Sequence, residues 1–258
     1  MLAGDPDEAV EKAEEFLKER SLLAYYDEVA LPGLKLAQND LLRGALQRVQ
    51  TEKIKGAVQE LLDDLSEEED RRPETAPTRD AEAAAAIEAS PEENTNLPVL
   101  TASDLKEGWQ SQIPILCVAG RGPLDEAAAA ILAQLLGRHG LSTRVEPAEA
   151  IASPNLFRLE TEGISLVCIS YLDNSSLPSM RYAIRRMRRK LPNAITLLGC
   201  WTDSDASRLQ EMVKADEVIN TLNAALAYAI GAATDSTGPL DQEPGLKLIS
   251  TNVKKSTA

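Results

Sequence analysis

The chain has 258 residues, of which 43% are hydrophobic, and its formal net charge is −14. This length allows one or two domains with a sizeable core, and the acidity argues against nucleic-acid binding through bulk charge, because phosphate contacts need a basic surface. No stretch approaches the roughly 20 apolar residues that span a bilayer, and the N-terminus lacks the basic and apolar segments of a signal peptide. We therefore expect a cytoplasmic location.

The acidic charge belongs to the N-terminal part of the chain. Residues 1–100 contain 24 acidic and 11 basic residues, whereas residues 101–258 contain 17 and 16. Residues 1–65 carry apolar side chains at helical spacing, which predicts a small helical bundle in which Pro32-Gly33 interrupts one apolar segment.

Residues 66–100 have almost no large apolar side chains, so burial cannot offset the entropy of ordering them. This composition predicts an acidic disordered linker, with residues 80–89 as the stretch expected to form a transient helix. The carboxylates at Asp63, Asp64 and residues 67–70 are interpreted as solvated charge.

From Ile113 onward, short β-rich runs alternate with longer helical patterns. The runs IPILCVAG, STRVEP, SLVCISYL, AITLLGCW and EVIN predict strands. Helices are expected over residues 125–138, 178–190, 205–214 and 222–230. Continuous apolar runs indicate strands covered on both faces, and alternation with helices indicates a parallel sheet. Residues 101–232 are therefore predicted to form an α/β domain with a five-stranded parallel, doubly wound, flavodoxin-like sheet. A flexible tail is expected over residues 233–258.

Three cysteines lie within or at the end of predicted strands. Cys117, Cys168 and Cys200 form no CxxC pair and no cluster with histidine, so we expect buried reduced thiols and no metal site.

Ligands of open α/β sheets bind at the carboxyl ends of the strands. The candidate ligand-binding residues are therefore those that follow the predicted strands: Gly120, Gly122, Asp125, Ser170, Leu172, Gly199 and Trp201. Gly120 and Gly122 precede a predicted helix and could cradle a phosphate with their backbone N–H groups. However, the loop has neither the P-loop nor the GxGxxG pattern. The alternative is a tight turn in which Asp125 lies near the start of the helix. A phosphoacceptor site is rejected, because Asp173 lacks the acidic pair that would help it to hold magnesium.

A catalytic set is not evident in the sequence. The chain has one histidine, His139, which is interpreted as a charge at the C-terminal end of a helix. A Ser/His/Asp arrangement is not expected, so the chain is predicted not to be an enzyme.

The stretch from Val118 to Trp201 resembles a cobalamin-binding domain. That family has Asp-x-His-x-x-Gly after its first strand, Ser-x-Leu after its third and Gly-Gly after its fourth. Here Ser170-Tyr171-Leu172 matches the second motif and Gly199-Cys200 half-matches the third, but Asp125 stands where the family has its histidine. The lower-ligand histidine is missing, so no cofactor is expected, although cobalamin could still bind with its own base attached.

Two further resemblances concern the context of the domain. Residues 2–5, 9 and 26–34 are similar to the helical module that precedes many cobalamin domains and caps the corrin. The segments LAGDPDEA, FLKERSL, YYDEVALP and AGRGPLDEAAAAILAQLLGRHGL resemble the soluble C-terminal region of bacterial membrane proteins in the autoinducer-2 exporter (PerM-like) family. The second resemblance implies a cytosolic domain of a membrane transporter, at the cytoplasmic face of the inner membrane.

The predicted helix over residues 178–190 is strongly basic. Its cations suggest an anionic partner, which could be a membrane surface, the membrane domain of the same polypeptide or the acidic N-terminal region of the same chain. The alternative is a solvated face, since basic residues are favoured near a helix C-terminus. The cations are Arg181, Arg185, Arg186, Arg188, Arg189 and Lys190.

The preferred interpretation is a non-catalytic cytosolic regulatory or ligand-sensing module. The alternatives are a true cobalamin-binding sensor or corrinoid carrier, and an enzyme that acts on an unidentified small molecule. The oligomeric state stays open.

Overall fold

The computed structural model describes residues 6–68, 70, 97–202 and 205–234. Most of the predicted linker, with its expected helix at residues 80–89, and nearly all of the predicted tail lie outside these residues. No helix in the described part of the chain combines the length and the apolar character needed to cross a bilayer.

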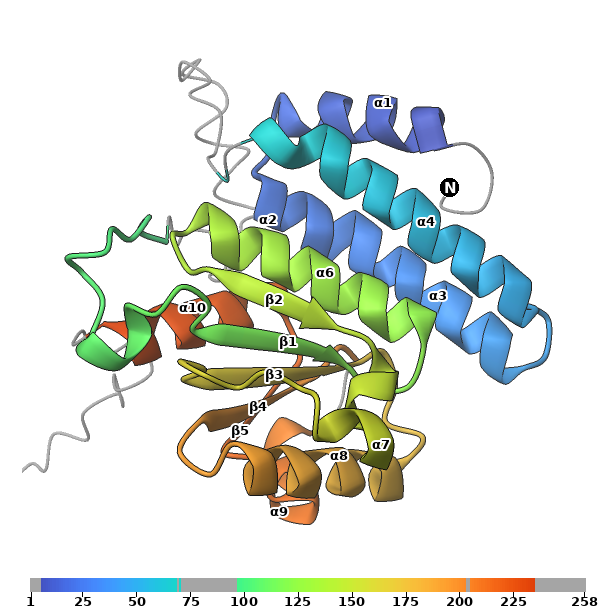
Figure 1. The fold of residues 1–258 in the computed structure, drawn as a ribbon. Helices are drawn as coiled ribbons and strands as arrows, with labels where there is room; N and C mark the ends of the chain where they lie inside the picture. Colours follow the sequence, from blue (N-terminus) through green and yellow to red (C-terminus); the bar gives the residue numbers. More distant parts are fainter. Residues whose placement is uncertain (1–5, 69, 71–96, 203–204, 235–258) are drawn as a thin grey trace, which may run out of the picture.

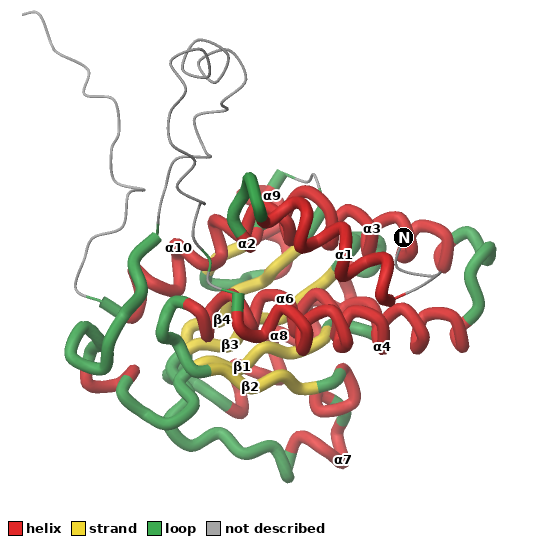
Figure 2. Tube along the Cα trace, turned by 90° about the horizontal axis from the view of Figure 1, so that it is seen from above, coloured by secondary structure: helices red, strands yellow, loops and turns green. Residues whose placement is uncertain are grey.

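A parallel sheet forms the centre of the molecule (Figure 1). Its five strands lie in the order β2-β1-β3-β4-β5, and each pair of neighbours is parallel. The strands are β1 (Ile115–Ala119), β2 (Thr143–Glu146), β3 (Leu166–Tyr171), β4 (Ile195–Cys200) and β5 (Glu217–Ile219). Figure 2 shows β2, β1, β3 and β4 side by side in this order. The strand order is that of flavodoxin-like folds, so the predicted fold class is confirmed.

Helices cover both faces of the sheet (Figure 1). One face packs against α6 (Pro123–Arg138), α10 (Leu222–Ala233) and the N-terminal helices, and the other packs against α7 (Ser153–Leu156), α8 (Leu177–Lys190) and α9 (Ala206–Val213). Successive strand residues point to opposite faces, so each strand contributes to two apolar cores. For example, Cys117 and Cys168 lie in the first core, whereas Val118 and Ile169 lie in the second. All three cysteines are buried, as predicted.

The N-terminal region is helical, as predicted. Its helices are α1 (Pro6–Leu17), α2 (Leu22–Tyr25), α3 (Leu31–Leu42) and α4 (Arg48–Asp64). The predicted interruption at Pro32-Gly33 was wrong. A π-helical turn at Tyr26–Ala30 joins α2 to α3 without a break, and Pro32 lies directly after this turn, in the first turn of α3.

The N-terminal helices pack directly on α6. Their apolar residues belong to the same continuous core as one face of the sheet. The Tyr26 hydroxyl donates a hydrogen bond to Gln134 Oε1, and Gln134 Nε2 donates to the Leu62 carbonyl at 2.6 Å. Gln134 of α6 therefore links two of the N-terminal helical segments.

Candidate functional site

The carboxyl ends of β1, β3 and β4 bring the predicted site residues together. Gly120 N–H donates to the Ser170 carbonyl at 2.9 Å, and Ser170 is the register partner of Gly199. Trp201 N–H in turn donates to the Tyr171 carbonyl at 2.9 Å. The parallel topology predicted this proximity, because neighbouring strands end at one edge of the sheet.

The space beside the two strand-end glycines is filled by aromatic side chains. A Cβ atom added to Gly120 would lie 2.5 Å from the Tyr171 ring, and one added to Gly199 would overlap the indole of Trp201. Tyr171 and Trp201 are both fully buried. The group that lies against the Gly199 backbone is therefore a side chain of the same chain.

Asp125 is a buried structural carboxylate, with 2% of its side chain exposed. Its Oδ1 accepts a hydrogen bond from Leu172 N–H at 2.8 Å, and its Oδ2 accepts one from Arg121 N–H at 3.0 Å. The carboxylate thus joins the loop after β1 to the loop after β3. Burial raises the pKa of Asp125 to about 6, although the Leu172 N–H and the Arg121 charge oppose this rise.

Arg121 forms the centre of a polar cluster above the same strands. Its guanidinium pairs with Asp173, donates to Ser175 Oγ at 3.0 Å and lies 5.6 Å from the centre of the Tyr171 ring. Asp173 also accepts a hydrogen bond from Gln38 Nε2 of α3 at 2.6 Å. The Arg121 side chain therefore closes the edge above Tyr171 and connects it to the N-terminal helices.

Most of the remaining predicted site residues are buried, and Gly122 is partly exposed. Ser170 is fully buried, and Leu172 contributes its backbone N–H to Asp125. Gly122 precedes α6 in an extended conformation with open space around it. Trp201 is fully buried, and its indole N–H has no acceptor among the described residues. Their role as ligand-binding residues stays a prediction.

The N-terminal helices also reach the carboxyl end of β5. Asp27 accepts hydrogen bonds from Leu222 N–H at 2.9 Å and Asn223 N–H at 3.1 Å, which satisfies two donors at the start of α10. Burial raises the pKa of Asp27, while these two hydrogen bonds oppose the rise. Together with the Gln38–Asp173 contact, Asp27 holds the N-terminal helices over the edge where a ligand would enter.

His139 and Asp70 form a second buried cluster that the sequence did not reveal. The His139 side chain is 2% exposed and that of Asp70 is 6% exposed. His139 Nε2 lies 3.1 Å from Asp70 Oδ2, and Nδ1 lies 2.9 Å from the Pro98 carbonyl. The interpretation of Asp70 as solvated charge was wrong, because Asp70 Oδ1 also accepts from Leu23 N–H at 2.8 Å. His139 does end α6, as expected, but it is buried there with acceptors on both nitrogens.

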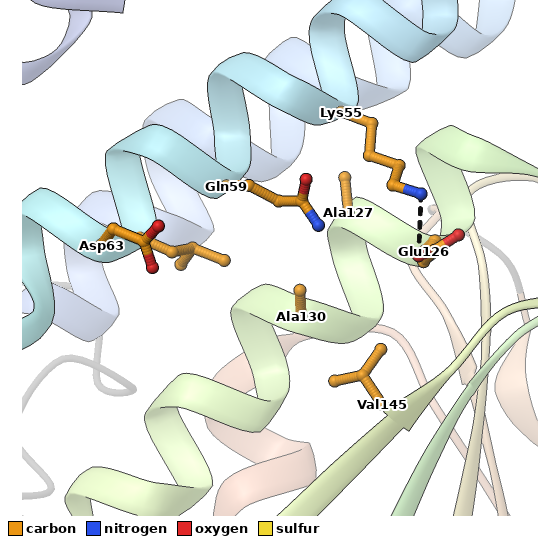
Figure 3. Close-up of a pocket in the computed structure, with 8 residues that line it drawn as sticks. Lys55, Gln59, Asp63, Glu126, Ala127, Ala130 and Val145 are labelled. Atoms are coloured by element: carbon orange, nitrogen blue, oxygen red, sulfur yellow. Dashed lines mark ion pairs between the residues drawn. The ribbon is translucent and has the colours of Figure 1, made fainter.

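A groove of about 550 Å³ lies between α4, α6 and β2 (Figure 3). The side chains of Ala127, Ala130 and Val145, which line the groove, are small and apolar and do not fill it. Lys55 forms an ion pair with Glu126 at 2.9 Å, and both residues also line the groove. The described lining includes no histidine, cysteine or serine. Within the described residues, no group of three or more His, Cys, Asp or Glu side chains is placed to hold a metal ion.

The contact between Gly199 and Trp201 makes the Gly199→Ala variant informative. The added Cβ would meet a rigid, buried indole, so we expect the free energy of unfolding to fall by about 1–3 kcal/mol. Chemical denaturation measures this change. The matched control is Gly56→Ala within α4, where a Cβ meets nothing within 4 Å and should stabilise the helix by about 0.5–1 kcal/mol. Equal stability of Gly199→Ala and the wild type would show that the indole is not packed as described.

Comparison with protein-family models and with curated proteins gives no match. Among solved structures, one described as a novel cobalamin-binding protein from Desulfitobacterium hafniense DCB-2 is similar to this chain at 10% identity and a TM-score of 0.39. The likeness covers 88% of this chain and 90% of the other. At this level it gives no information about what the present chain binds.

Proposed function

We propose that this chain is a non-catalytic regulatory module whose carboxyl-edge ligand site is closed by its own side chains. One observation carries the proposal. The Tyr171 ring and the Trp201 indole occupy the space beside Gly120 and Gly199, where a ligand would need to approach the backbone. The two rings belong to different cores on opposite faces of the sheet, so the backbone at these strand ends is covered on both sides.

The engagement of Asp125 supports the same proposal. In the cobalamin-binding resemblance, this position belongs to the histidine that serves as the lower ligand of cobalt. Both oxygens of Asp125 are instead occupied by backbone N–H groups of the chain itself. Carboxylate is also a poor substitute for imidazole in such a role.

The state of His139 supports a role without catalysis. It is the only histidine in the chain, and both of its ring nitrogens face hydrogen-bond acceptors in a buried setting. It is therefore not positioned as a general base for a nucleophile. The resemblance to PerM-like proteins supports the further proposal that the module belongs to the cytosolic part of a bacterial membrane transporter.

Titration with hydroxocobalamin tests the closed site directly. We expect no saturable change in the visible spectrum of added cobalamin up to about 100 µM, which corresponds to a binding free energy weaker than about −5 kcal/mol. Trp201→Ala, which empties the space beside Gly199, is the companion variant and is checked for folding by circular dichroism. Saturable binding by the wild type would replace the proposal with a true cobalamin-binding sensor or carrier. Binding that is gained only in Trp201→Ala would locate the closed site at the indole.

A further inference from the structure

Helix α8 concentrates positive charge on an otherwise acidic chain. It contains six cations and no acidic residue within Leu177–Lys190. Residues 101–258 contain 16 cations and 17 acidic residues, so α8 alone holds six of these cations. Without α8, this part of the chain would be distinctly acidic.

Several of these cations are tied to neighbouring elements. Arg181 Nε donates to the Met212 carbonyl at 2.6 Å, and Arg188 pairs with Asp216. On the other flank, Arg186 donates to Ser153 Oγ at 2.9 Å. These contacts fix α8 between α7 and α9 and determine which of its side chains point outward.

The outward ridge consists of Tyr182, Arg185 and Arg189. These residues follow helical spacing and are exposed, while Met180, Ala183, Ile184 and Met187 form the buried face of α8. Neither the Arg185 side chain nor the Arg189 side chain has a hydrogen bond or an ion pair with another described residue. The two guanidinium groups are therefore available to an external anion.

Exposed aromatic side chains flank this ridge. Phe157, at the end of α7, is 86% exposed, and Tyr182 is 47% exposed. Lys190 Nζ lies 3.5 Å from the Phe157 carbonyl, which places Phe157 beside the C-terminal turn of α8. Aromatic side chains next to arginines and lysines are typical of surfaces that lie on a lipid bilayer, where the ring enters the headgroup region.

The acidic N-terminal helices lie away from this surface. Helices α7, α8 and α9 cover one face of the sheet, and the acidic N-terminal helices lie beyond the opposite face (Figure 1). Packed layers are about 10 Å thick, which exceeds the screening length of about 8 Å at physiological ionic strength. A planar anionic surface at α8 would therefore attract the basic ridge while the repulsion from the N-terminal helices is screened.

We propose that the ridge Tyr182–Arg185–Arg189, with Phe157, docks on an anionic lipid bilayer. The exposed rings favour lipid over nucleic acid or an acidic protein surface, because a bilayer offers an apolar layer beneath its negative headgroups. This inference does not depend on the closed ligand site, which lies at the carboxyl ends of the strands.

Co-sedimentation of the full chain with vesicles tests the proposal. We expect binding to phosphatidylcholine vesicles that contain phosphatidylserine, none to phosphatidylcholine alone, and a decrease as salt is added. Each cation near the surface contributes about 1 kcal/mol, so the double variant Arg185→Ala/Arg189→Ala should bind about 30-fold more weakly. Phe157→Ala should weaken binding at every salt concentration, because it removes an apolar contact.

The matched control removes two exposed cations from α4. Arg48→Ala/Lys53→Ala makes the same change in net charge on the other side of the sheet, and it should bind vesicles as the wild type does. Circular dichroism checks that each variant is folded. The proposal is overturned if the wild type does not prefer anionic vesicles, or if the two double variants lose affinity equally. Binding to duplex DNA without binding to vesicles would also overturn it.

Discussion

Replacement of Asp125 by alanine is expected to lower the free energy of unfolding by about 2–4 kcal/mol at neutral pH. The change would leave the N–H groups of Arg121 and Leu172 without their acceptor, and each unsatisfied buried donor costs about 1–3 kcal/mol. Chemical denaturation of the purified variant measures the loss. Asp125→Asn keeps one acceptor oxygen for Leu172 but turns an amide NH₂ toward Arg121 N–H, so an intermediate loss is expected. Equal stability of Asp125→Ala and the wild type would contradict the structural role.

The difference in the free energy of unfolding between the wild type and Asp125→Ala is expected to decrease as the pH rises. Burial raises the folded-state pKa of Asp125 from 3.8 to about 6, so the folded protein holds this proton more tightly than the unfolded chain. The resulting stabilisation is fully present below pH 3.8 and is lost as the pH rises through about 6. The stability advantage of the wild type over Asp125→Ala should therefore be larger near pH 4 than near neutrality.

The buried pair His139–Asp70 gives the second large expected effect. The two ring nitrogens face the Pro98 carbonyl and the Asp70 carboxylate, so a doubly protonated ring would donate to both acceptors. His139→Ala would leave the Asp70 charge buried without its cation, at a cost of about 2–4 kcal/mol in the free energy of unfolding. His139→Gln, which carries its donors on one amide nitrogen instead of two separate ring nitrogens, is expected to lose less.

Alkaline conditions should weaken this cluster. Burial acts to lower the pKa of His139, but its hydrogen bonds to Asp70 and Pro98 and the Asp70 charge raise it above 6.5 overall. The stabilisation is therefore fully present below pH 6.5 and is lost as the pH rises through the higher folded-state value. The other polar groups of this region are Arg138, which donates to the Leu65 and Ser66 carbonyls, and Tyr26, whose pKa burial raises. Parallel denaturation series for the wild type and His139→Gln would separate the imidazole from the other groups. A difference between the two that does not change with pH would argue against an imidazolium.

The sheet and its helices could be predicted because their signals are local. Continuous apolar runs such as Leu166–Tyr171 indicate strands covered on both faces, and the pattern over Pro123–Arg138 indicates a helix. The proximity of Gly120, Ser170 and Gly199 also follows from a parallel sheet. In contrast, the path through Pro32 was mispredicted, because a π-helical turn lies directly before the first turn of α3, which contains this proline.

The state of the candidate site could not be predicted from the same signals. Whether Asp125 points toward a ligand or toward backbone N–H groups depends on the loop after β3, which lies 47 residues away in the sequence. The filling of the site depends on the side-chain directions of Tyr171 and Trp201, and the strand pattern does not fix these directions. Asp70 and His139 are 69 residues apart, and each is unremarkable within its own segment. The parallel sheet therefore predicted that Gly120, Ser170 and Gly199 lie together, but the structure was needed to see which side chains fill the space beside the two glycines.

The burial of Trp201 also gives the protein an intrinsic optical probe. The chain has two tryptophans, Trp109 and Trp201, and both are buried. An indole that moves from a dry interior into water shifts its fluorescence emission to longer wavelengths. Trp201 packs against Gly199 at the carboxyl edge, so a change at this edge that moves the indole can be followed in unlabelled protein, with Trp109→Phe used to isolate the signal.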